Sequence, residues 1–205
     1  MTPAKRILDI LLAILLACLL ILPFLMVLLL LLVTEGRPLF YVSERMKTPT
    51  QGFSLIKLRT MRPSAENTGV TGGDKSDRIP PVYRVLRKTR MDEIPQLWNI
   101  LRGDMSFVGP RPPLRVYVEA FPQIYAQVLK NRPGLTGLAS LSFHRHEERL
   151  LAATNTAAET DQVYRRRCVP RKARLDLIYQ QHQTICFDLV LLGRTFSRVL
   201  WRSNR

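Results

Sequence analysis

Hydrophobic residues are concentrated at the start of the chain, where positions 10–33 are almost continuously apolar. A helix of about 20 apolar residues is long enough to cross a bilayer, so this run predicts a membrane segment. From Glu35 onward polar and basic residues dominate, and prolines recur. The pattern divides the chain into a membrane-embedded segment, residues 1–36, and one water-exposed domain, residues 37–205.

Pro23 interrupts the apolar run near its middle. Proline lacks a backbone N–H and clashes with the preceding turn, so a helix should bend or break there. The part before it, residues 10–22, would be only about 20 Å long, shorter than a hydrocarbon core of about 30 Å. Basic residues flank both ends of the run, among them Lys5 and Arg37, which disfavours a spanning orientation. Physical argument alone leaves a spanning helix and a re-entrant helix, which enters and leaves by one face, equally open.

The next part of the chain predicts a small β-hairpin and a short helix. Apolar positions on both sides of the polar stretch 47–52 predict two strands joined by a turn. Residues 63–77 indicate a loop, because glycines and short polar side chains dominate them. Residues 94–101 have the i, i+3, i+4, i+7 spacing of an amphipathic helix, and Gly103 supplies its C-terminal stop.

Further helices are expected over residues 115–130, 147–162 and 175–201. The second is polar and should face solvent. The third is amphipathic and basic, so it either lies on a membrane surface or packs on the domain core. The predicted fold class is therefore α+β and mostly helical. It comprises a proline-broken membrane helix, a small β-hairpin and amphipathic interfacial helices in one compact domain.

The formal net charge of +15 indicates anionic partners: nucleic acid, anionic lipid or a phosphate-rich small molecule. An apolar anchor favours the last two, so we expect no nucleic-acid partner. The three cysteines, Cys18, Cys168 and Cys186, are too sparse for a disulfide framework and indicate a reducing compartment. The cysteine pattern therefore predicts that the water-exposed domain is cytoplasmic.

The densest group of reactive side chains surrounds two adjacent carboxylates, Asp92 and Glu93. The basic residues near them in sequence are Arg84, Arg87, Lys88, Arg90, Arg102 and Arg111. Phosphoryl transfer uses such a mixture: a carboxylate as nucleophile or metal ligand, and guanidinium groups that bind phosphate oxygens. An acidic pair can also simply favour a helix N-terminus, and from spacing alone this structural explanation is the commoner one.

A series of short motifs carries a family resemblance along nearly the whole chain. In order, they are residues 5–9 (KRILD), 36–40 (GRPLF), 57–61 (KLRTM), 92–99 (DEIPQLWN), 103–112 (GDMSFVGPRP), 133–137 (PGLTG) and 176–179 (DLIY). With these motifs the chain resembles the monotopic phosphoglycosyl transferases, the bacterial sugar transferase family that starts many cell-surface glycan pathways.

The resemblance implies a two-step reaction. Asp92 would attack the sugar-bearing phosphorus of a UDP-sugar, releasing UMP and leaving a phosphosugar ester on its carboxylate. Polyprenyl (undecaprenyl) phosphate would then take the sugar phosphate, giving polyprenyl diphosphate-sugar, the first membrane step of a surface glycan pathway. Glu93 is the second catalytic carboxylate of the family. Mg²⁺, with Asp92 as protein ligand, would neutralise the diphosphate.

By position, Arg87 and Arg111 would bind the substrate phosphates, with Lys57 and Arg59 as weaker candidates. The family has a re-entrant membrane helix broken at a proline, so the resemblance favours a re-entrant helix bent at Pro23 over a spanning one. This places the protein among the lipids of the bacterial inner membrane with its domain on the cytoplasmic face. A homodimer remains open, and nothing in the sequence identifies the sugar.

The chain departs from the family pattern at three places. Residues 43–47 lack the Gln and Gly of a Gln-x-Arg-x-Gly run, Leu58 replaces Phe, and Ser140 stands where Gln is common. None of these positions belongs to the acidic pair. Two other classes remain as alternatives: a non-enzymatic, membrane-tethered binder of nucleic acid or acidic lipid, and a metal-dependent membrane phosphatase.

Overall fold

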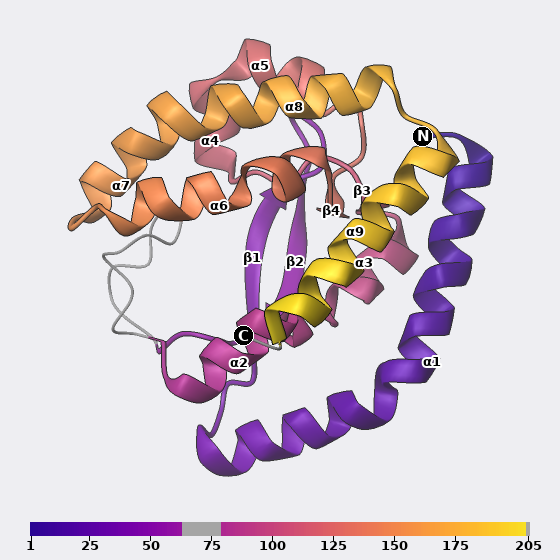
Figure 1. Ribbon diagram of the computed structural model, residues 1–205, viewed down its shortest axis with the longest axis vertical. Helices are drawn as coiled ribbons and strands as arrows, with labels where there is room; N and C mark the ends of the chain where they lie inside the picture. The colour runs from indigo at the N-terminus through magenta and orange to yellow at the C-terminus, as the bar shows by residue number, and fades with distance from the viewer. Residues whose placement is uncertain (63–78, 204–205) are drawn as a thin grey trace.

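The computed structural model describes residues 1–62 and 79–203 and has the predicted α+β, mostly helical character (Figure 1). The elements in chain order are α1 Pro3–Thr34, β1 Phe40–Met46, β2 Gly52–Leu58, α2 Pro81–Thr89, the 3₁₀ turn η2 Met91–Glu93, α3 Gln96–Arg102, β3 Ser106–Val108, α4 Arg115–Ala120, α5 Pro122–Val128, β4 Gly134–Thr136, α6 Leu138–Ala152, α7 Ala157–Val163, the π-helical turn η3 Tyr164–Cys168, α8 Val169–Gln181 and α9 Ile185–Ser203. The predicted loop over residues 63–77 lies outside the described residues.

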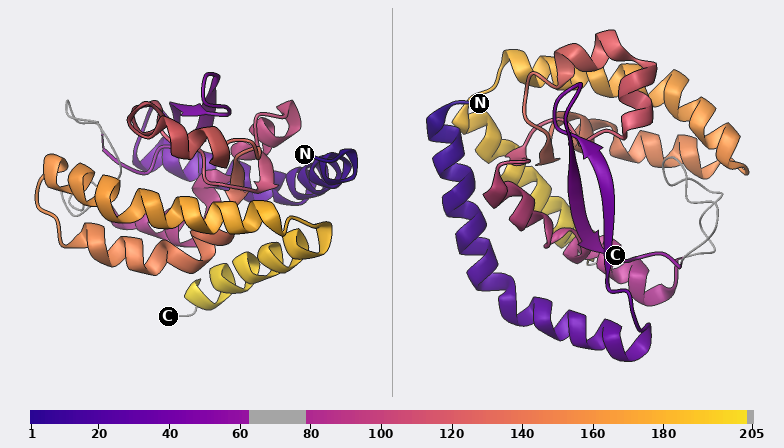
Figure 2. Two further views of the ribbon diagram at one scale, coloured as in Figure 1. Left: turned by 90° about the horizontal axis from the view of Figure 1, so that it is seen from above. Right: turned by 180° about the vertical axis from the view of Figure 1, so that it is seen from behind.

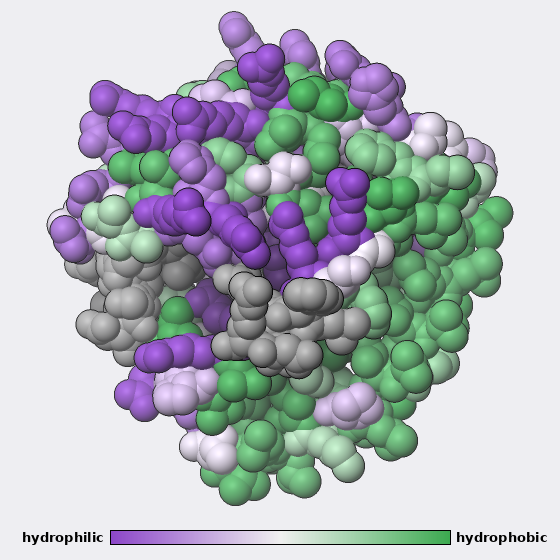
Figure 3. All heavy atoms as spheres, in the orientation of Figure 1, coloured by the Kyte–Doolittle hydropathy of each residue, from purple (hydrophilic) through white to green (hydrophobic). Residues whose placement is uncertain are grey.

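Helix α1 is a single long apolar helix that bends between two halves (Figure 1). Pro23 lies inside it, and a proline is the usual cause of a sharp bend. By length and composition the helix could cross a membrane. Figure 3 shows apolar side chains as a band along both halves, and Leu19, Leu22 and Met26 are each at least 70% exposed. A surface this apolar requires a lipid or protein environment.

The N-terminal end of α1 is fixed to the domain by buried polar contacts. Lys5 Nζ lies 2.5 Å from a carboxylate oxygen of Asp188 on α9, and both side chains are almost fully buried. The Arg6 guanidinium donates to the carbonyls of Ile100 and Leu101 at the end of α3, at 2.6 and 2.7 Å. Both carbonyls belong to the last turn of α3, where backbone partners are incomplete, and Ile100 O also accepts from the backbone N–H of Gly103. The basic residues that precede the apolar run therefore have a structural role that the sequence did not reveal.

The predicted hairpin is confirmed, with β1 and β2 antiparallel and Phe40 opposite Leu58. Phe53 and Leu55 on β2 are buried in the core beside α3. Since side chains alternate along a strand, Lys57 is on the same face as these two residues, one step further along. The hairpin and the helices α6, α8 and α9 lie on opposite sides of the molecule (Figure 2).

A second, parallel pair of short strands, β3 and β4, was not predicted from the sequence. The two strands approach closely because of glycine: a Cβ on Gly134 would lie 2.1 Å from the amide nitrogen of Gly109. No side chain could be accommodated there. This pairing fixes the start of the loop 110–112, which carries Arg111.

Three helix predictions need correction. The predicted helix over residues 115–130 is divided into α4 and α5, because the backbone of Phe121 leaves the helical conformation before Pro122. The stretch 175–201 contributes to two helices, α8 and α9, rather than one. The segment 147–162 does not simply face solvent, since Leu151 is buried. The core beneath it joins α4, α5, α6, η3 and α8.

Candidate active site

The acidic pair lies in a sharp turn between two helices. Arg90 ends α2 in the left-handed conformation, with φ of 61°, which is uncommon for a residue with a side chain. The chain then forms the short 3₁₀ turn that carries Asp92 and Glu93, and Pro95 precedes the first residue of α3. The prediction that the pair stands just before a helix start is confirmed. The turn directs both carboxylates into one cavity.

Glu93 is held by two arginines. Arg90 Nη1 donates to Glu93 Oε1 at 2.8 Å, and Arg111 Nη2 donates to the same oxygen at 3.2 Å. Burial alone would raise the pKa of Glu93, but Arg111 and then Arg90 outweigh it, so the pKa lies below its usual range. Glu93 is therefore ionised at neutral pH and positions both guanidinium groups.

Asp92 has no such partner. Its side chain is almost fully buried, and Oδ1 accepts no hydrogen bond from any residue that the structure describes. Burial, followed by the charge of Glu93, raises the pKa of Asp92 to about 6, although Lys57, Arg87 and Arg90 act in the opposite direction. An unpaired buried carboxylate destabilises a fold, and a perturbed pKa in a cavity marks a candidate functional residue.

Lys57 faces the acidic pair from strand β2. Burial, followed by the neighbouring charges of Arg111 and Arg45, lowers the pKa of Lys57 to about 8, while Asp92 opposes this shift. The ammonium group also lies 5.1 Å from the centre of the Tyr41 ring. Lys57 is thus a cation near neutral pH that loses its charge under mildly alkaline conditions.

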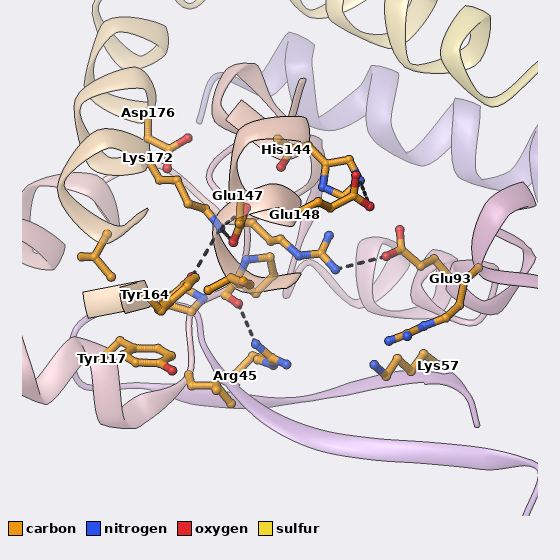
Figure 4. A pocket seen from close by; sticks show the side chains of 18 of the residues that line it. Arg45, Lys57, Glu93, Tyr117, His144, Glu147, Glu148, Tyr164, Lys172 and Asp176 are labelled. Carbon is orange, nitrogen blue, oxygen red and sulfur yellow. Dashed lines mark hydrogen bonds and ion pairs between the residues drawn. The ribbon is translucent and has the colours of Figure 1, made fainter. Parts of the chain in front are cut away.

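These residues line one end of a cavity of about 760 Å³ (Figure 4). That volume is within the range of small-molecule sites in proteins. Arg84, Arg87 and Lys88 of α2 border the same end as Asp92. The opposite end is formed by α6, η3 and α8, which contribute Glu147, Tyr164, Lys172 and Asp176. A buried carboxylate surrounded by cations is an arrangement that can bind an anionic phosphate group and bring it close to a carboxylate oxygen.

The sequence profile described as "Bacterial sugar transferase" matches residues 1–202. The chain belongs to the bacterial sugar transferase family. This finding confirms the family expected from the motifs.

Three relatives show how far the similarity extends. The exopolysaccharide production protein ExoY of Sinorhizobium fredii is 32% identical over 96% of this chain and 85% of its own length. The UDP-glucose:undecaprenyl-phosphate glucose-1-phosphate transferase of Caulobacter vibrioides is 33% identical over 98% of this chain and 71% of its own. A Bacillus subtilis protein, provisionally named an undecaprenyl-phosphate N-acetylgalactosaminyl 1-phosphate transferase, is 44% identical over 41% of this chain, and the match covers 48% of that protein.

Most of the predicted site residues meet in the cavity of this sugar transferase. Arg87, Arg111 and Lys57 line it together with Asp92 and Glu93. Arg59 is directed elsewhere: its guanidinium donates to the carbonyls of Glu35 and Gly36 beyond the end of α1, at 3.2 and 3.3 Å. Pro23 lies within α1, which bends but continues as one helix from Pro3 to Thr34 rather than breaking.

Charged residues of the transferase's cavity that were not predicted as site residues from the sequence include Arg45, Glu147, Lys172 and Asp176. Arg45 donates to the carbonyl of Pro112 at 3.3 Å and thereby supports the loop that carries Arg111. Glu147, Lys172 and Asp176 come from helices whose sequence pattern gave no sign of which face turns inward. Asp176 alone had a signal, since it opens one of the family motifs.

A divalent cation is compatible with the end of the cavity that carries Asp92 and Glu93. Within residues 1–62 and 79–203 there is no cluster of three or more His, Cys, Asp or Glu side chains with metal-binding geometry. Mg²⁺ does not require one, because it binds through one or two carboxylates and completes its shell with water and substrate phosphates. The unpartnered Oδ1 of Asp92 provides an oxygen of the right kind.

Proposed function

We propose that this transferase moves a sugar-1-phosphate from a UDP-sugar to polyprenyl phosphate, through a phosphosugar covalently bound to Asp92. The products are polyprenyl diphosphate-sugar and UMP. The observation that carries the proposal is the unpartnered, almost fully buried Asp92 carboxylate in a cavity lined by cations. The relatives' names, which specify undecaprenyl phosphate and sugar-1-phosphate, support the choice of substrates.

In the first step a carboxylate oxygen of Asp92 attacks the phosphorus that bears the sugar. A bond forms between that oxygen and phosphorus, and the bond between phosphorus and the UMP oxygen breaks. Arg87, Lys57 and Arg111 stabilise the negative charge on the transferring and leaving phosphates. With a pKa of about 6, Asp92 is largely ionised at neutral pH and remains more basic than an ordinary aspartate.

In the second step a phosphate oxygen of the lipid attacks the same phosphorus. The bond between phosphorus and Asp92 breaks, and the carboxylate is regenerated. Glu93 contributes by positioning: it holds Arg90 and Arg111 at the cavity throughout both steps. No proton transfer is needed, because the attacking and leaving groups are anionic oxygens.

In this scheme Asp92 would be the protein ligand that holds Mg²⁺, a cation that needs only one or two carboxylates from the protein. When bound, it would neutralise part of the diphosphate charge. The surrounding arginines and Lys57 supply the remaining positive charge from the protein.

We also propose that α1 enters the bilayer and returns on the cytoplasmic face of the bacterial inner membrane. The bend in a helix that contains Pro23, the exposed apolar side chains of both halves and the docking of its first turn on the domain support this arrangement. Such a helix holds the cavity near the interface, where a water-soluble nucleotide and a lipid phosphate can both reach it.

UMP release measures this function directly. The purified full chain in lipid nanodiscs is mixed with a panel of UDP-sugars, with and without polyprenyl phosphate and Mg²⁺. We expect about one UMP per protein without lipid acceptor and continuous turnover when acceptor is added. Complete hydrolysis of the UDP-sugar without acceptor would instead identify a phosphatase, and no release from any UDP-sugar would refute the proposal.

A further inference from the structure

The end of the cavity farther from Asp92 and Glu93 is chemically different from the cationic end. We call it the inner end and define it by six residues: Tyr117, Tyr125, Glu147, Tyr164, Lys172 and Asp176. The three tyrosines and Asp176 are each at most 8% exposed. At the cationic end, by contrast, Arg84 and Lys88 of α2, which line the cavity, are exposed to solvent. The inner end is thus the enclosed part of the cavity.

Its polar groups include both donors and acceptors. Lys172 Nζ donates to the two carboxylate oxygens of Glu147, at 2.9 and 3.2 Å, and to the Tyr164 hydroxyl at 3.3 Å (Figure 4). This pairing fixes the Glu147 carboxylate and the Tyr164 hydroxyl at the cavity wall. The rings of Tyr117 and Tyr164, whose centroids are 4.7 Å apart, add an apolar surface beside these polar groups.

Asp176 is the unexplained member of this group. Its carboxyl group is buried against the cavity and makes no hydrogen bond or ion pair with the residues that the structure describes. Burial raises its pKa to about 7, against the charge of Lys172. Because Asp176 lines the cavity and its carboxyl group makes no hydrogen bond with the described residues, a ligand bound there can supply its hydrogen-bond partners.

Arg111 connects the two ends. It donates to Glu93 at 3.2 Å, and its pKa is raised first by Glu93 and also, more weakly, by Glu147. Arg111 thus pairs with Glu93 and also feels the charge of Glu147, and all three residues line the same cavity. A ligand whose phosphorus lies at Asp92 can extend past Arg111 into the inner end.

The proposed function decides which part of the ligand extends there. In two successive in-line displacements on one phosphorus, UMP leaves from the position opposite Asp92, and the lipid phosphate later attacks from that same position. Nucleotide and lipid must therefore exchange through the open end. The sugar stays on the phosphorus during both steps, so it requires a place outside the exchange path.

We infer that the inner end binds the sugar ring of the nucleotide sugar and selects it through Glu147, Tyr164, Lys172 and Asp176. This inference rests on the proposed function. A sugar offers hydroxyl or acetamido groups that both donate and accept, which matches carboxyl, ammonium and phenol groups. A phosphate would be repelled by the two carboxylates. A site built to hydrogen-bond a hydroxyl discriminates strongly against a substrate that lacks it.

The test uses two variants and one control. Asp176→Ala removes the unpartnered carboxyl, and since that group has no partner to leave unsatisfied, the fold should tolerate the change. Tyr164→Phe removes only a hydroxyl. The control is Glu119→Gln on α4, which removes a carboxylate that is exposed and does not line the cavity. Each protein is assayed for UMP release from the UDP-sugar panel and for binding of UMP alone by calorimetry.

We expect kcat/KM for the best UDP-sugar to fall about 10- to 100-fold in both variants, as for a lost hydrogen bond to substrate. The order of preference among the UDP-sugars should change. The Kd for UMP should stay within about 2-fold of the wild-type value, because UMP lacks the sugar and the phosphate that bears it. The control should match the wild type. Loss of UMP affinity by the same factor as kcat/KM would place the nucleotide in the inner end and overturn the inference, as would an unchanged sugar preference.

Failure of the proposed function gives a different result. If the wild type releases no UMP from any UDP-sugar, the transferase mechanism is refuted by that measurement alone. Calorimetry then still tests the inner end: UDP-sugar should bind more tightly than UDP to the wild type, and Asp176→Ala should abolish the difference. Equal affinity for UDP-sugar and UDP in the wild type would overturn the inference independently.

Discussion

Asp92 and Glu93 are adjacent in the chain, yet only Glu93 is paired. Glu93 accepts hydrogen bonds from Arg90 and Arg111, whereas Oδ1 of Asp92 is buried without a partner. Their pKa values move in opposite directions for this reason. Two neighbouring carboxylates in different environments can serve different purposes, one to organise the cations and one to react.

The first prediction concerns stability. The folded-state pKa of Asp92 is raised, so protonation of Asp92 stabilises the fold. This stabilisation is complete below the unfolded pKa of 3.8 and is lost as the pH rises through about 6. At pH 7.5 the buried charge destabilises the fold. Asp92→Asn should therefore unfold at a higher temperature, with a gain of about 1–3 kcal/mol. Thermal unfolding in nanodiscs checks this, and the gain should vanish near pH 4; a gain independent of pH would contradict the assignment.

The second prediction is a bell-shaped pH profile for kcat/KM with UDP-sugar. Activity should fall below about pH 6, where Asp92 becomes protonated and loses its nucleophilicity. It should fall again above about pH 8, where Lys57 loses its charge. Lys57→Arg should retain the acidic limb and move the alkaline limb to higher pH. An alkaline limb unchanged in that variant would show that another group produces it.

The third prediction separates cavity arginines from surface arginines. Arg111→Lys should lower kcat/KM about 10- to 100-fold, because lysine cannot reach Glu93 and a phosphate with one planar group. Arg102→Lys is the matched control, since Arg102 is mostly exposed and its nearest carboxylate is that of Asp104. Initial rates of UMP release measure both. Equal losses in the two variants would mean that the net positive charge matters more than the geometry of Arg111.

The fourth prediction concerns the attachment of α1 through Lys5 and Asp188. Asp188→Asn leaves the Lys5 ammonium buried without a counter-charge, which should cost about 3–5 kcal/mol. The double variant Lys5→Met with Asp188→Asn removes both charges and should unfold at a higher temperature than Asp188→Asn alone. Additive losses in the double variant would show that the two groups do not interact.

The sequence predicted most of what its local chemistry controls. The apolar run, the hairpin and the helix after Asp92 follow from periodicity and from proline and glycine, whose effects on the backbone are local. The acidic pair and Arg111 followed from their motifs. By contrast, the β3–β4 pair joins segments 28 positions apart, Ser106 with Gly134, through a close glycine approach that no periodicity reveals.

The inner end of the cavity was missed for a similar reason. Glu147 begins a segment that was expected to face solvent, Asp176 lies in one expected either on a membrane surface or on the core, and Lys172 lies outside every predicted helix. Only the packing of α6 against α8 turns these side chains toward each other. Arg59 is the opposite case. It was predicted as a phosphate-binding residue because it belongs to a family motif, but its guanidinium donates to backbone carbonyls just beyond the end of α1. Tertiary packing determines which polar side chains share a cavity.

The most direct test of the account is intact-protein mass spectrometry of the wild type after mixing with UDP-sugar in the absence of lipid acceptor. A covalent intermediate on Asp92 should increase the mass by one phosphosugar, which peptide fragmentation assigns to Asp92 and which disappears when polyprenyl phosphate is added. Asp92→Asn should show no adduct and no UMP release. Steady turnover by Asp92→Asn, or wild-type turnover with no adduct under any quenching condition, would contradict the central claim.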